Sequence, residues 1–315
     1  MNIQFKIDVS SGLTKSPKTL PSKYFYDEIG DKLFVKIMNL PEYYLTRAEY
    51  EIFDTKSEDI IRKLKINPSD TIDLIELGAG DGKKTKTFLK VLLEKKYNFK
   101  YVPIDISIHA LKALETSCKM EFSNLDIEIK QGEYFGVLED VKTNKSQKII
   151  MFLGSNLGNL EDEAAQDFLT KLSNALQVGD KIILGLDCIK PEEIVLPAYN
   201  DSQGVTKAFN LNLLHRINKE LHADFDVSNF DHVPEYDEKT GIAKSFLVSK
   251  KEQKVSFNRD QTYYKFSKGE KIQTETSRKY NDRILQTLLR NTNLVQISKI
   301  SDSNNYFNSY ILERV

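Results

Sequence analysis

Short apolar segments alternate with amphipathic stretches through the middle of the chain, and this alternation constrains the fold more than any other feature. Between Ser57 and Cys188 each apolar segment has the length of a buried strand, and apolar positions in the intervening stretches recur at helical spacing. Such alternation is typical of a parallel sheet in an α/β protein. We expect strands at Ile72–Leu77, Tyr101–Ile106, Ile127–Gln131, Lys148–Leu153 and Lys181–Cys188, and helices at Lys83–Lys95, Ser107–Met120 and Glu161–Leu176.

The pattern changes after Cys188. A helical stretch is followed by short segments with Gly-containing turns between them, which indicates antiparallel strands. We therefore expect an insert near Lys190–Lys279, with an N-terminal helical segment around Lys23–Asn39 packed against it. The expected elements are a helix at Gln203–Leu221, strands at Ile242–Val248, Lys254–Phe257 and Thr262–Phe266, a helix at Asn281–Asn291, and closing strands at Leu294–Ile300 and Tyr306–Leu312.

Composition excludes several classes of protein. With 45 Lys+Arg against 46 Asp+Glu, no basic excess exists to neutralise phosphates, so we expect no nucleic-acid partner. Cys118 and Cys188 are far apart, and the 4 histidines form no ligand motif, so we expect no metal. No apolar run reaches the length of a signal peptide core or a membrane span. We expect a cytoplasmic protein with no membrane partner.

A glycine-rich turn follows the first predicted strand. Gly78, Gly80 and Gly82 form a G-x-G-x-G pattern between that strand and a helix. Glycines allow a ligand close to the backbone, and a helix N-terminus offers free N–H groups. The spacing differs from the G-x-G-x-x-G of dinucleotide binders, which favours an S-adenosylmethionine-like ligand over NAD. A turn of this kind also occurs for purely structural reasons.

Two further loops strengthen the cofactor hypothesis. Asp105 ends the second predicted strand, 25 positions beyond Gly80 (105 minus 80), where a carboxylate can accept hydrogen bonds from both ribose hydroxyls. The alternative is a helix cap, because Asp105 and Ser107 precede a helix. Glu133 and Tyr134 follow the third strand, where an acidic residue and an aromatic ring can bind and cover an adenine.

The segment that follows the fourth predicted strand, Phe152–Asn159, resembles the FLGS-x-x-GN motif of the histidine-specific, S-adenosylmethionine-dependent methyltransferases. The likeness runs nearly end to end. It includes 20–27 and 40–47 near the N-terminus, 198–201, 204–206, 209–210, 223–226 and 230–232 in the insert, and 274–280 after it. The resemblance implies a Rossmann-like class I methyltransferase sheet with an inserted α+β substrate-binding domain. Residues 48–189 and 280–315 would form the methyltransferase domain, and 1–47 and 190–279 the substrate-binding domain.

The resemblance also implies roles for individual residues. It assigns Nα-methylation of L-histidine to the chain, with three methyl groups added to give hercynine in ergothioneine biosynthesis, and S-adenosylhomocysteine as the other product. Glu275 and Ser277 would address the imidazole. The hydroxyl of Tyr26 is a further candidate, outside the roles that the resemblance carries over, for ordering water near the amine. Cofactor contacts would come from Gly78, Lys84, Asp105, Glu133 and Tyr134, and the substrate's carboxylate and amino group would be held by Tyr43, Asn159 and Tyr199.

Methyl transfer from a sulfonium requires a neutral amine in line with the S–CH₃ bond, and positioning can supply about 7–11 kcal/mol of the acceleration. Asn159 can direct the lone pair through its amide oxygen, although without the motif it would be an ordinary turn residue. Glu275 and Ser277 share one face if the segment is a strand. An exposed strand with alternating polar residues would show the same pattern.

Ser245 departs from the family pattern, in which a bulky apolar side chain often lines the substrate pocket. This departure leaves open the same reaction on another aromatic amino acid, such as a tryptophan derivative or tyrosine. A cofactor-binding module without catalysis is a further alternative, which the intact set of Gly78, Asp105, Asn159 and Tyr199 opposes. We expect a small-molecule amino-acid substrate and a monomeric protein.

Overall fold

The structure is a computed structural model that describes residues 3–141, 146–257 and 261–315. Contacts divide the chain into two compact units, and each unit combines two separate stretches of sequence. Unit 1 comprises Met1–Tyr44 and Lys190–Arg278, and unit 2 comprises Leu45–Ile189 and Lys279–Val315.

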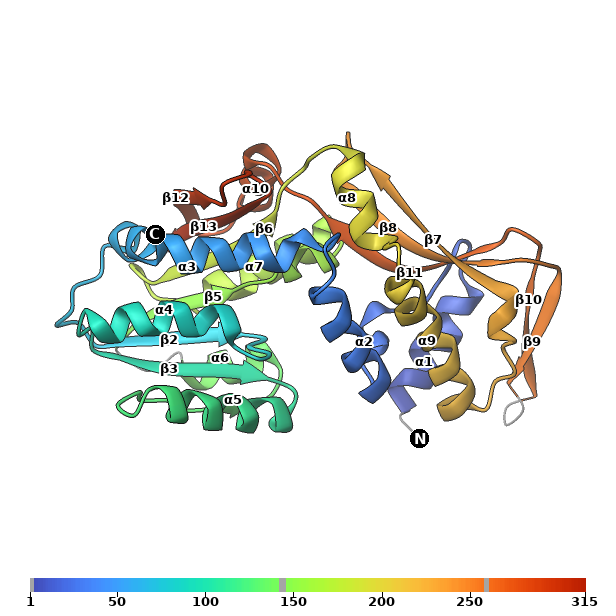
Figure 1. Ribbon diagram of the computed structural model, residues 1–315, viewed down its shortest axis with the longest axis horizontal. Coiled ribbons are helices and arrows are strands. Elements are labelled where there is room, and N and C mark those ends of the chain that lie inside the picture. The colour runs from blue at the N-terminus through green and yellow to red at the C-terminus, as the bar shows by residue number, and fades with distance from the viewer. Residues whose placement is uncertain (1–2, 142–145, 258–260) are drawn as a thin grey trace. The chain divides into compact units, whose positions relative to one another are not determined.

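Unit 2 is built around a sheet that has seven strands among the described residues, in the order β12-β13-β6-β5-β2-β3-β4 (Figure 1). The neighbours from β6 to β4 pair in parallel, whereas β13 runs antiparallel to β6 and β12 antiparallel to β13. This arrangement confirms the Rossmann-like α/β class expected from the sequence. The strands are β2 (Ile72–Leu77), β3 (Phe99–Asp105), β4 (Lys130–Gln131), β5 (Gln147–Phe152), β6 (Lys181–Asp187), β12 (Leu294–Ser301) and β13 (Phe307–Arg314).

The third expected strand is much shorter than predicted. We expected Ile127–Gln131, but only Lys130 and Gln131 form β4, and Ile127 makes an isolated bridge to Tyr101 of β3. This segment lies at the sheet edge, where β3 is its only strand neighbour among the described residues. It therefore receives backbone hydrogen bonds from one side and pairs discontinuously.

Helices cover both faces of the unit 2 sheet. Successive strand residues point to opposite faces, so Leu74 belongs to one apolar core and Ile75 to the other. The first core is closed by helices on one face, α3 (Tyr44–Leu64), α4 (Lys83–Glu94) and α5 (Ile108–Glu121). The second core is closed on the other face by α6 (Tyr134–Val141), α7 (Asp162–Asn174) and α10 (Asp282–Leu288).

Unit 1 is an α+β structure with its own apolar core. Its sheet has the order β1-β11-β8-β7, with β1 parallel to β11 and the other pairs antiparallel, and β9 and β10 form a separate hairpin. The strands are β1 (Lys18–Thr19), β7 (Phe230–Asp237), β8 (Ile242–Ser249), β9 (Gln253–Phe257), β10 (Thr262–Phe266) and β11 (Lys271–Arg278). The helical elements are α1 (Ile3–Thr14), η1 (Ser22–Phe25), α2 (Glu28–Met38), α8 (Glu192–Tyr199), α9 (Val205–Leu221) and η3 (Val227–Asn229).

Side-chain caps fix where two helices of unit 1 begin. Asp27 accepts a hydrogen bond from Gly30 N at 2.7 Å at the start of α2, and the same carboxylate accepts one from Asn212 of α9 at 2.8 Å. Asp201 caps α9 by accepting from Val205 N and Thr206 N at 2.9 and 2.7 Å. These bonds satisfy N–H groups that a helix start leaves unpaired. The N-terminal helix α2 is thereby tied to α9 of the insert.

Within the described part of the chain, we find no helix that combines the length and the apolar character needed to cross a membrane.

A buried ion pair lies where the chain re-enters unit 2. Lys279 Nζ lies 2.8 Å from Asp187 Oδ2 at the end of β6, and both side chains are completely buried. Taking two charges out of water is costly, and their attraction offsets that cost only while both are present.

We predict that Lys279→Met lowers the free energy of unfolding by about 3–5 kcal/mol, because Asp187 then remains buried without its cation. Lys119→Met is the matched control, since Lys119 forms an exposed ion pair with Glu115 in α5. Its loss should stay below about 1 kcal/mol. Guanidinium denaturation of the three proteins measures the difference, and equal losses in both variants would contradict the prediction.

Candidate functional site

The order of strands in unit 2 reverses at β2, which lies between β3 and β5. In open parallel sheets ligands bind beyond the carboxyl ends of the strands at such a reversal point. Gly78 follows β2 directly, Asp105 is the last residue of β3, and Asn159 ends the loop that follows β5. The fold therefore gathers residues from three sequence motifs at one edge of this sheet.

The glycine turn has the backbone conformation that its residues predict. Gly78, Gly80 and Gly82 have φ values of +73°, +54° and +63°, in the left-handed region that favours glycine. A Cβ at Gly78 would lie 2.7 Å from the Tyr134 hydroxyl, whereas a Cβ at Gly80 would meet nothing within 4 Å. The turn thus presents bare backbone beside an open space, which fits the close approach of a nucleoside-bearing cofactor.

Asp105 and Tyr134 stand at this turn. Asp105 Oδ2 lies 3.5 Å from Gly80 N, while Oδ1 accepts a hydrogen bond from Ser107 N at 2.9 Å. Ser107 itself caps α5 through Ala110 N at 3.2 Å, so the carboxylate of Asp105 is not needed as the helix cap. Burial, and then the charge of Asp105, raise the pKa of the Tyr134 phenol. Glu133 is exposed just before α6.

Lys84, in the first turn of α4, forms an ion pair with Glu49 of α3. The Glu49 carboxylate is almost fully buried, and it also accepts hydrogen bonds from Gly154 N, with oxygen distances of 2.9 and 3.0 Å. Sequence reasoning missed Glu49, because a single glutamate in a charged helical stretch carries no signal of burial. Through Lys84 and Gly154, Glu49 contacts the first turn of α4 and the loop after β5, which both contain predicted site residues.

Asn159 is exposed at the end of the 3₁₀ helix η2 (Asn156–Asn159). Another amide of the same motif lies closer to the glycine turn. Asn156 Nδ2 is 3.9 Å from the Cβ position of Gly78 and 3.6 Å from that of Gly154. The motif therefore places one amide against the turn and a second amide, that of Asn159, toward solvent.

A buried carboxylate beneath the glycine turn also escaped sequence reasoning. Glu76 of β2 accepts hydrogen bonds from Thr85 at 2.7 Å and from the Tyr101 hydroxyl. Burial raises the pKa of Glu76 to about 7, against the lowering effect of the hydrogen bonds from Tyr101 and Thr85. These bonds tie β2 and β3 to the first turn of α4.

In unit 1, adjacent strands bring together two of the predicted substrate residues. Ser245 of β8 pairs with Glu275 of β11, and Ser245 Oγ donates a hydrogen bond to Glu275 Oε2 at 3.0 Å. A register shift between Gln273 and Glu275 produces this pairing. Thr274 at the shift donates to Asn210 Oδ1 of α9 at 2.8 Å, which anchors the irregular strand.

Ser277 lies two residues beyond Glu275 on the same strand, and it has a partner from α8. Tyr199, the last residue of α8, donates its hydroxyl proton to Ser277 Oγ at 2.7 Å, and both side chains are buried. The phenol oxygen of Tyr199 keeps acceptor capacity, because a hydroxyl that donates one bond can still accept.

Tyr26 and Tyr43 belong to an aromatic cluster of unit 1. The ring of Tyr26 meets Phe34 and Phe209 edge-on, with centroids 5.5 and 5.7 Å apart, and Phe34 in turn meets Tyr43 at 6.4 Å. Burial, and then the charge of Glu275, raise the pKa of the Tyr26 phenol, although 46% of the residue's surface is exposed. Tyr26 therefore lies close enough to Glu275 to feel its charge and stays protonated at neutral pH.

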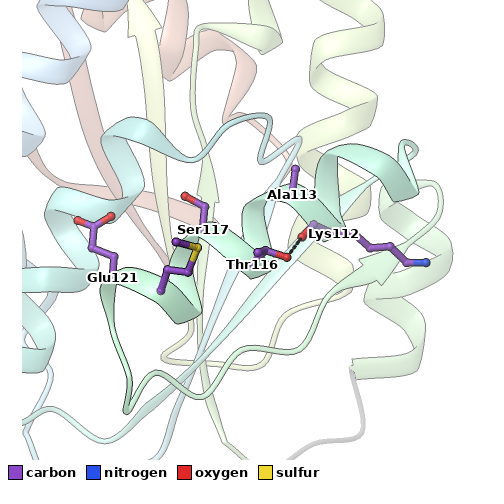
Figure 2. Close-up of a pocket in the computed structure, with 6 residues that line it drawn as sticks. Lys112, Ala113, Thr116, Ser117 and Glu121 are labelled. Carbon is purple, nitrogen blue, oxygen red and sulfur yellow. Dashed lines mark hydrogen bonds between the residues drawn. The ribbon is translucent and has the colours of Figure 1, made fainter.

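The surface hollow drawn in Figure 2 lies elsewhere, on α5. Thr116 bonds back to the carbonyl of Lys112 there, and Met120 is 84% exposed. None of its lining residues is a predicted site residue. The lining consists of Lys112, Ala113, Thr116, Ser117, Met120 and Glu121.

Comparison with known proteins identifies the family. The model of the family described as "Histidine-specific methyltransferase, SAM-dependent" matches residues 5–314. The chain belongs to this family. It is 36% identical over 279 residues to a protein of Mycobacterium tuberculosis named histidine N-alpha-methyltransferase, covering 89% of this chain and 85% of that one. The resemblance inferred from the sequence motifs is thus confirmed.

More distant relatives of this methyltransferase family differ in name and length. The ergothioneine biosynthesis protein 1 of Schizosaccharomyces pombe is 26% identical over 302 residues, which cover 94% of this chain but 39% of that protein. An L-tryptophan methyltransferase of Psilocybe serbica is 25% identical over 315 residues, covering 91% of this chain and 87% of that one. The names within this group therefore cover more than one aromatic amino acid.

His232 of β7 is a buried group to which the sequence motif gave no role. It is 7% exposed, and neither ring nitrogen has a hydrogen-bond partner among the described residues. It pairs with Leu247 of β8, and Leu247 lies two positions from Ser245 on that strand. Burial, and then the charge of Lys207, lower the pKa of His232 to about 4.

We predict that unit 1 loses stability as the pH falls from 7 to 5. An unfolded histidine takes up a proton near pH 6.5, whereas folded His232 stays neutral down to about pH 4, so the proton stabilises only the unfolded chain. The loss should be about 2 kcal/mol. Urea denaturation of wild type and His232→Phe at both pH values measures it as the difference between the two proteins, because Glu76, with its pKa raised to about 7, contributes with the opposite sign to both. His232→Phe should lose about 2 kcal/mol less than wild type over this range, and the exposed His222→Asn should lose as much as wild type. An unchanged slope in His232→Phe would refute the assignment.

Proposed function

We propose that this protein is an S-adenosylmethionine-dependent methyltransferase of the α-amino group of L-histidine, and that it adds three methyl groups to give hercynine. The observation that supports histidine as the substrate is the polar pair Ser245 and Glu275 on β8 and β11. The Glu275 carboxylate and the Ser245 hydroxyl are 3.0 Å apart, and Ser277, which accepts from Tyr199 of α8, lies on the same strand as Glu275; together these groups can bond both nitrogens of an imidazole. The names of the family and of its mycobacterial relative support the same substrate.

We assign cofactor binding to unit 2. The bare turn at Gly78 would accommodate the cofactor, Asp105 would accept hydrogen bonds from its ribose, and Tyr134 with Glu133 would flank its adenine. Lys84 would face its carboxylate. Bound there, the cofactor supplies a methyl group on a sulfonium, which a neutral amine can accept.

We assign substrate binding residue by residue, and Asn159 would direct the amine. Because the Tyr199 proton goes to Ser277, the Tyr199 oxygen is suited to accept from the substrate's amino group. Tyr43 would donate to the carboxylate, and protonated Tyr26 would order water near the amine. Hydroxyls of this kind bind charged groups without adding charge of their own.

Further parts of the proposal concern setting and partners. The substrates are small molecules, the chemistry requires no metal, and we place the enzyme in the cytoplasm as a monomer. Ergothioneine biosynthesis is the pathway in which we place the product.

We predict that Asp105→Ala weakens S-adenosylmethionine binding by roughly 1.5–3 kcal/mol, or about ten- to a hundredfold in Kd, because a charge-assisted bond to the ribose is lost. Titration calorimetry measures the affinity. Asp126→Ala removes an exposed carboxylate from the segment beside β3 and serves as the control. Equal affinities in wild type and Asp105→Ala would remove Asp105 from the cofactor site.

The alternative substrate is another aromatic amino acid, and Ser245 motivates it. Ser245 is fully buried, yet it is small where the resemblance to the family implies a bulky apolar side chain. It either gives Glu275 a polar partner, as its hydrogen bond indicates, or leaves space for a larger ring.

We predict that wild type prefers histidine over tryptophan and tyrosine in a competition assay with labelled cofactor, and that Glu275→Ala loses both histidine turnover and this preference. A site built to bond a polar ring rejects a ring that leaves its own polar groups unpaired. Mass spectrometry of the product counts the methyl groups.

Glu235→Ala is the control for this competition, since Glu235 is half-exposed on the neighbouring strand β7 and pairs with Lys271. Its substrate preference should match that of wild type. A wild-type preference for tryptophan or tyrosine would overturn the histidine assignment and leave the methyltransferase assignment standing.

A further inference from the structure

Glu49 of α3 is a buried carboxylate of unit 2, and its surroundings leave room for it. It is 1% exposed, and a Cβ at Gly185 of β6 would lie 2.2 Å from its Oε1. Only a residue without a side chain leaves room for the carboxylate at that position. A charge this deeply buried is tolerated when it is paired and hydrogen-bonded, as Glu49 is by Lys84 and Gly154.

The loop that Glu49 binds has an unusual backbone. Gly154 has φ of +74°, and the next residue, Ser155, has φ of +57°. A left-handed conformation costs a residue with a Cβ about 1–2 kcal/mol. Gly154 has no Cβ and adopts this conformation without that cost, whereas Ser155 persists in it only where the surrounding structure holds it.

Two hydrogen-bonded anchors hold this loop. On one side, Gly154 N donates to both oxygens of Glu49, at 2.9 and 3.0 Å. On the other side, Ser155 Oγ accepts a hydrogen bond from Asp187 N at 3.0 Å. The first anchor is the stronger kind, because its acceptor is a carboxylate in an ion pair with Lys84. The loop leads directly into η2 and to Asn159.

We propose that Glu49 is a positioning residue for methyl transfer: by accepting the Gly154 N–H it fixes the strained loop after β5, and so the place of the Asn159 amide. The inference rests on the proposed function, in which Asn159 directs the substrate's amine. Its ion pair with Lys84 ties the same carboxylate to the first turn of α4. One buried side chain then couples the loop after β5 to the loop after β2.

The test separates the hydrogen bond from the charge. Glu49→Gln keeps an oxygen that can accept the Gly154 N–H, whereas Glu49→Ala removes the acceptor. Glu58→Gln is the matched control, because Glu58 lies on the same helix and forms an exposed ion pair with Lys95. Two readouts are needed: kcat with histidine at saturating cofactor, and the amide signal of Gly154 in the protein without ligands.

The amide signal reports the anchor without any turnover. The chain has 14 glycines, so ¹⁵N-glycine labelling gives a simple spectrum, and carbonyl labelling of leucine marks the glycines that follow a leucine, Gly154 among them. A strong hydrogen bond to a carboxylate moves an amide proton downfield. We expect that signal farthest upfield in Glu49→Ala, at an intermediate position in Glu49→Gln, which keeps an acceptor without its charge, and at its wild-type position in Glu58→Gln.

We expect kcat to fall more than tenfold in Glu49→Ala and to stay within threefold of wild type in Glu49→Gln and Glu58→Gln. If Glu49→Ala does not fold, Glu49→Asp replaces it, because its carboxylate is one methylene too short to reach Gly154. An unmoved Gly154 signal in Glu49→Ala, a kcat within threefold of wild type, or a Glu49→Gln as slow as Glu49→Ala would each overturn the inference. A wild-type protein that fails to methylate histidine would refute the proposed function instead, while the Gly154 signal would still test the anchor.

Discussion

Parallel pairing of β2 with β3 on one side and β5 on the other is the constraint on which the proposed cofactor site depends. Parallel neighbours end at the same edge of a sheet, so the residues that follow them are gathered however far apart they lie in sequence. Gly78, Asp105 and the loop from Gly154 to Asn159 reach one edge for this reason. The helices on both faces bury every residue of β2 and β6, and the edge remains the place where polar groups and bare backbone are presented.

The polar groups proposed to bind the amino acid depend on a different kind of pairing. In unit 1 the antiparallel strands β8 and β11 set Ser245 opposite Glu275, and the register shift before Glu275 decides that pairing. A one-residue slip would turn each side chain of the strand to the other face. The hydrogen bond from Thr274 to Asn210 of α9 holds the register shift in place. Neither residue was a predicted site residue, yet this bond determines which hydroxyl lies opposite Glu275.

Periodicity predicted the regular elements well and the irregular ones poorly. The strands Ile72–Leu77 and Thr262–Phe266 agree with β2 and β10, because a short apolar or alternating run between turn residues has few other solutions. The long helix α3 was not predicted. Its sequence mixes charged and apolar residues, and a kink at Lys56 interrupts its period. The edge strand β4 was expected to be longer, since periodicity does not report how many neighbours a strand has.

The same limit applies to the candidate site. The sequence motifs contain Lys84, Gly154 and Ser155, but the side chains with which these residues interact depend on the three-dimensional packing. Glu49 comes to Lys84 and Gly154 only because α3 folds over this face of the sheet and Gly185 leaves a gap there. A buried carboxylate of this kind looks in sequence like any exposed glutamate of a charged helix, such as Glu58. Its burial beside a left-handed serine shows that the loop after β5 is held against its own backbone preference. We infer that a partner from the distant helix α3, Glu49, keeps this loop in place.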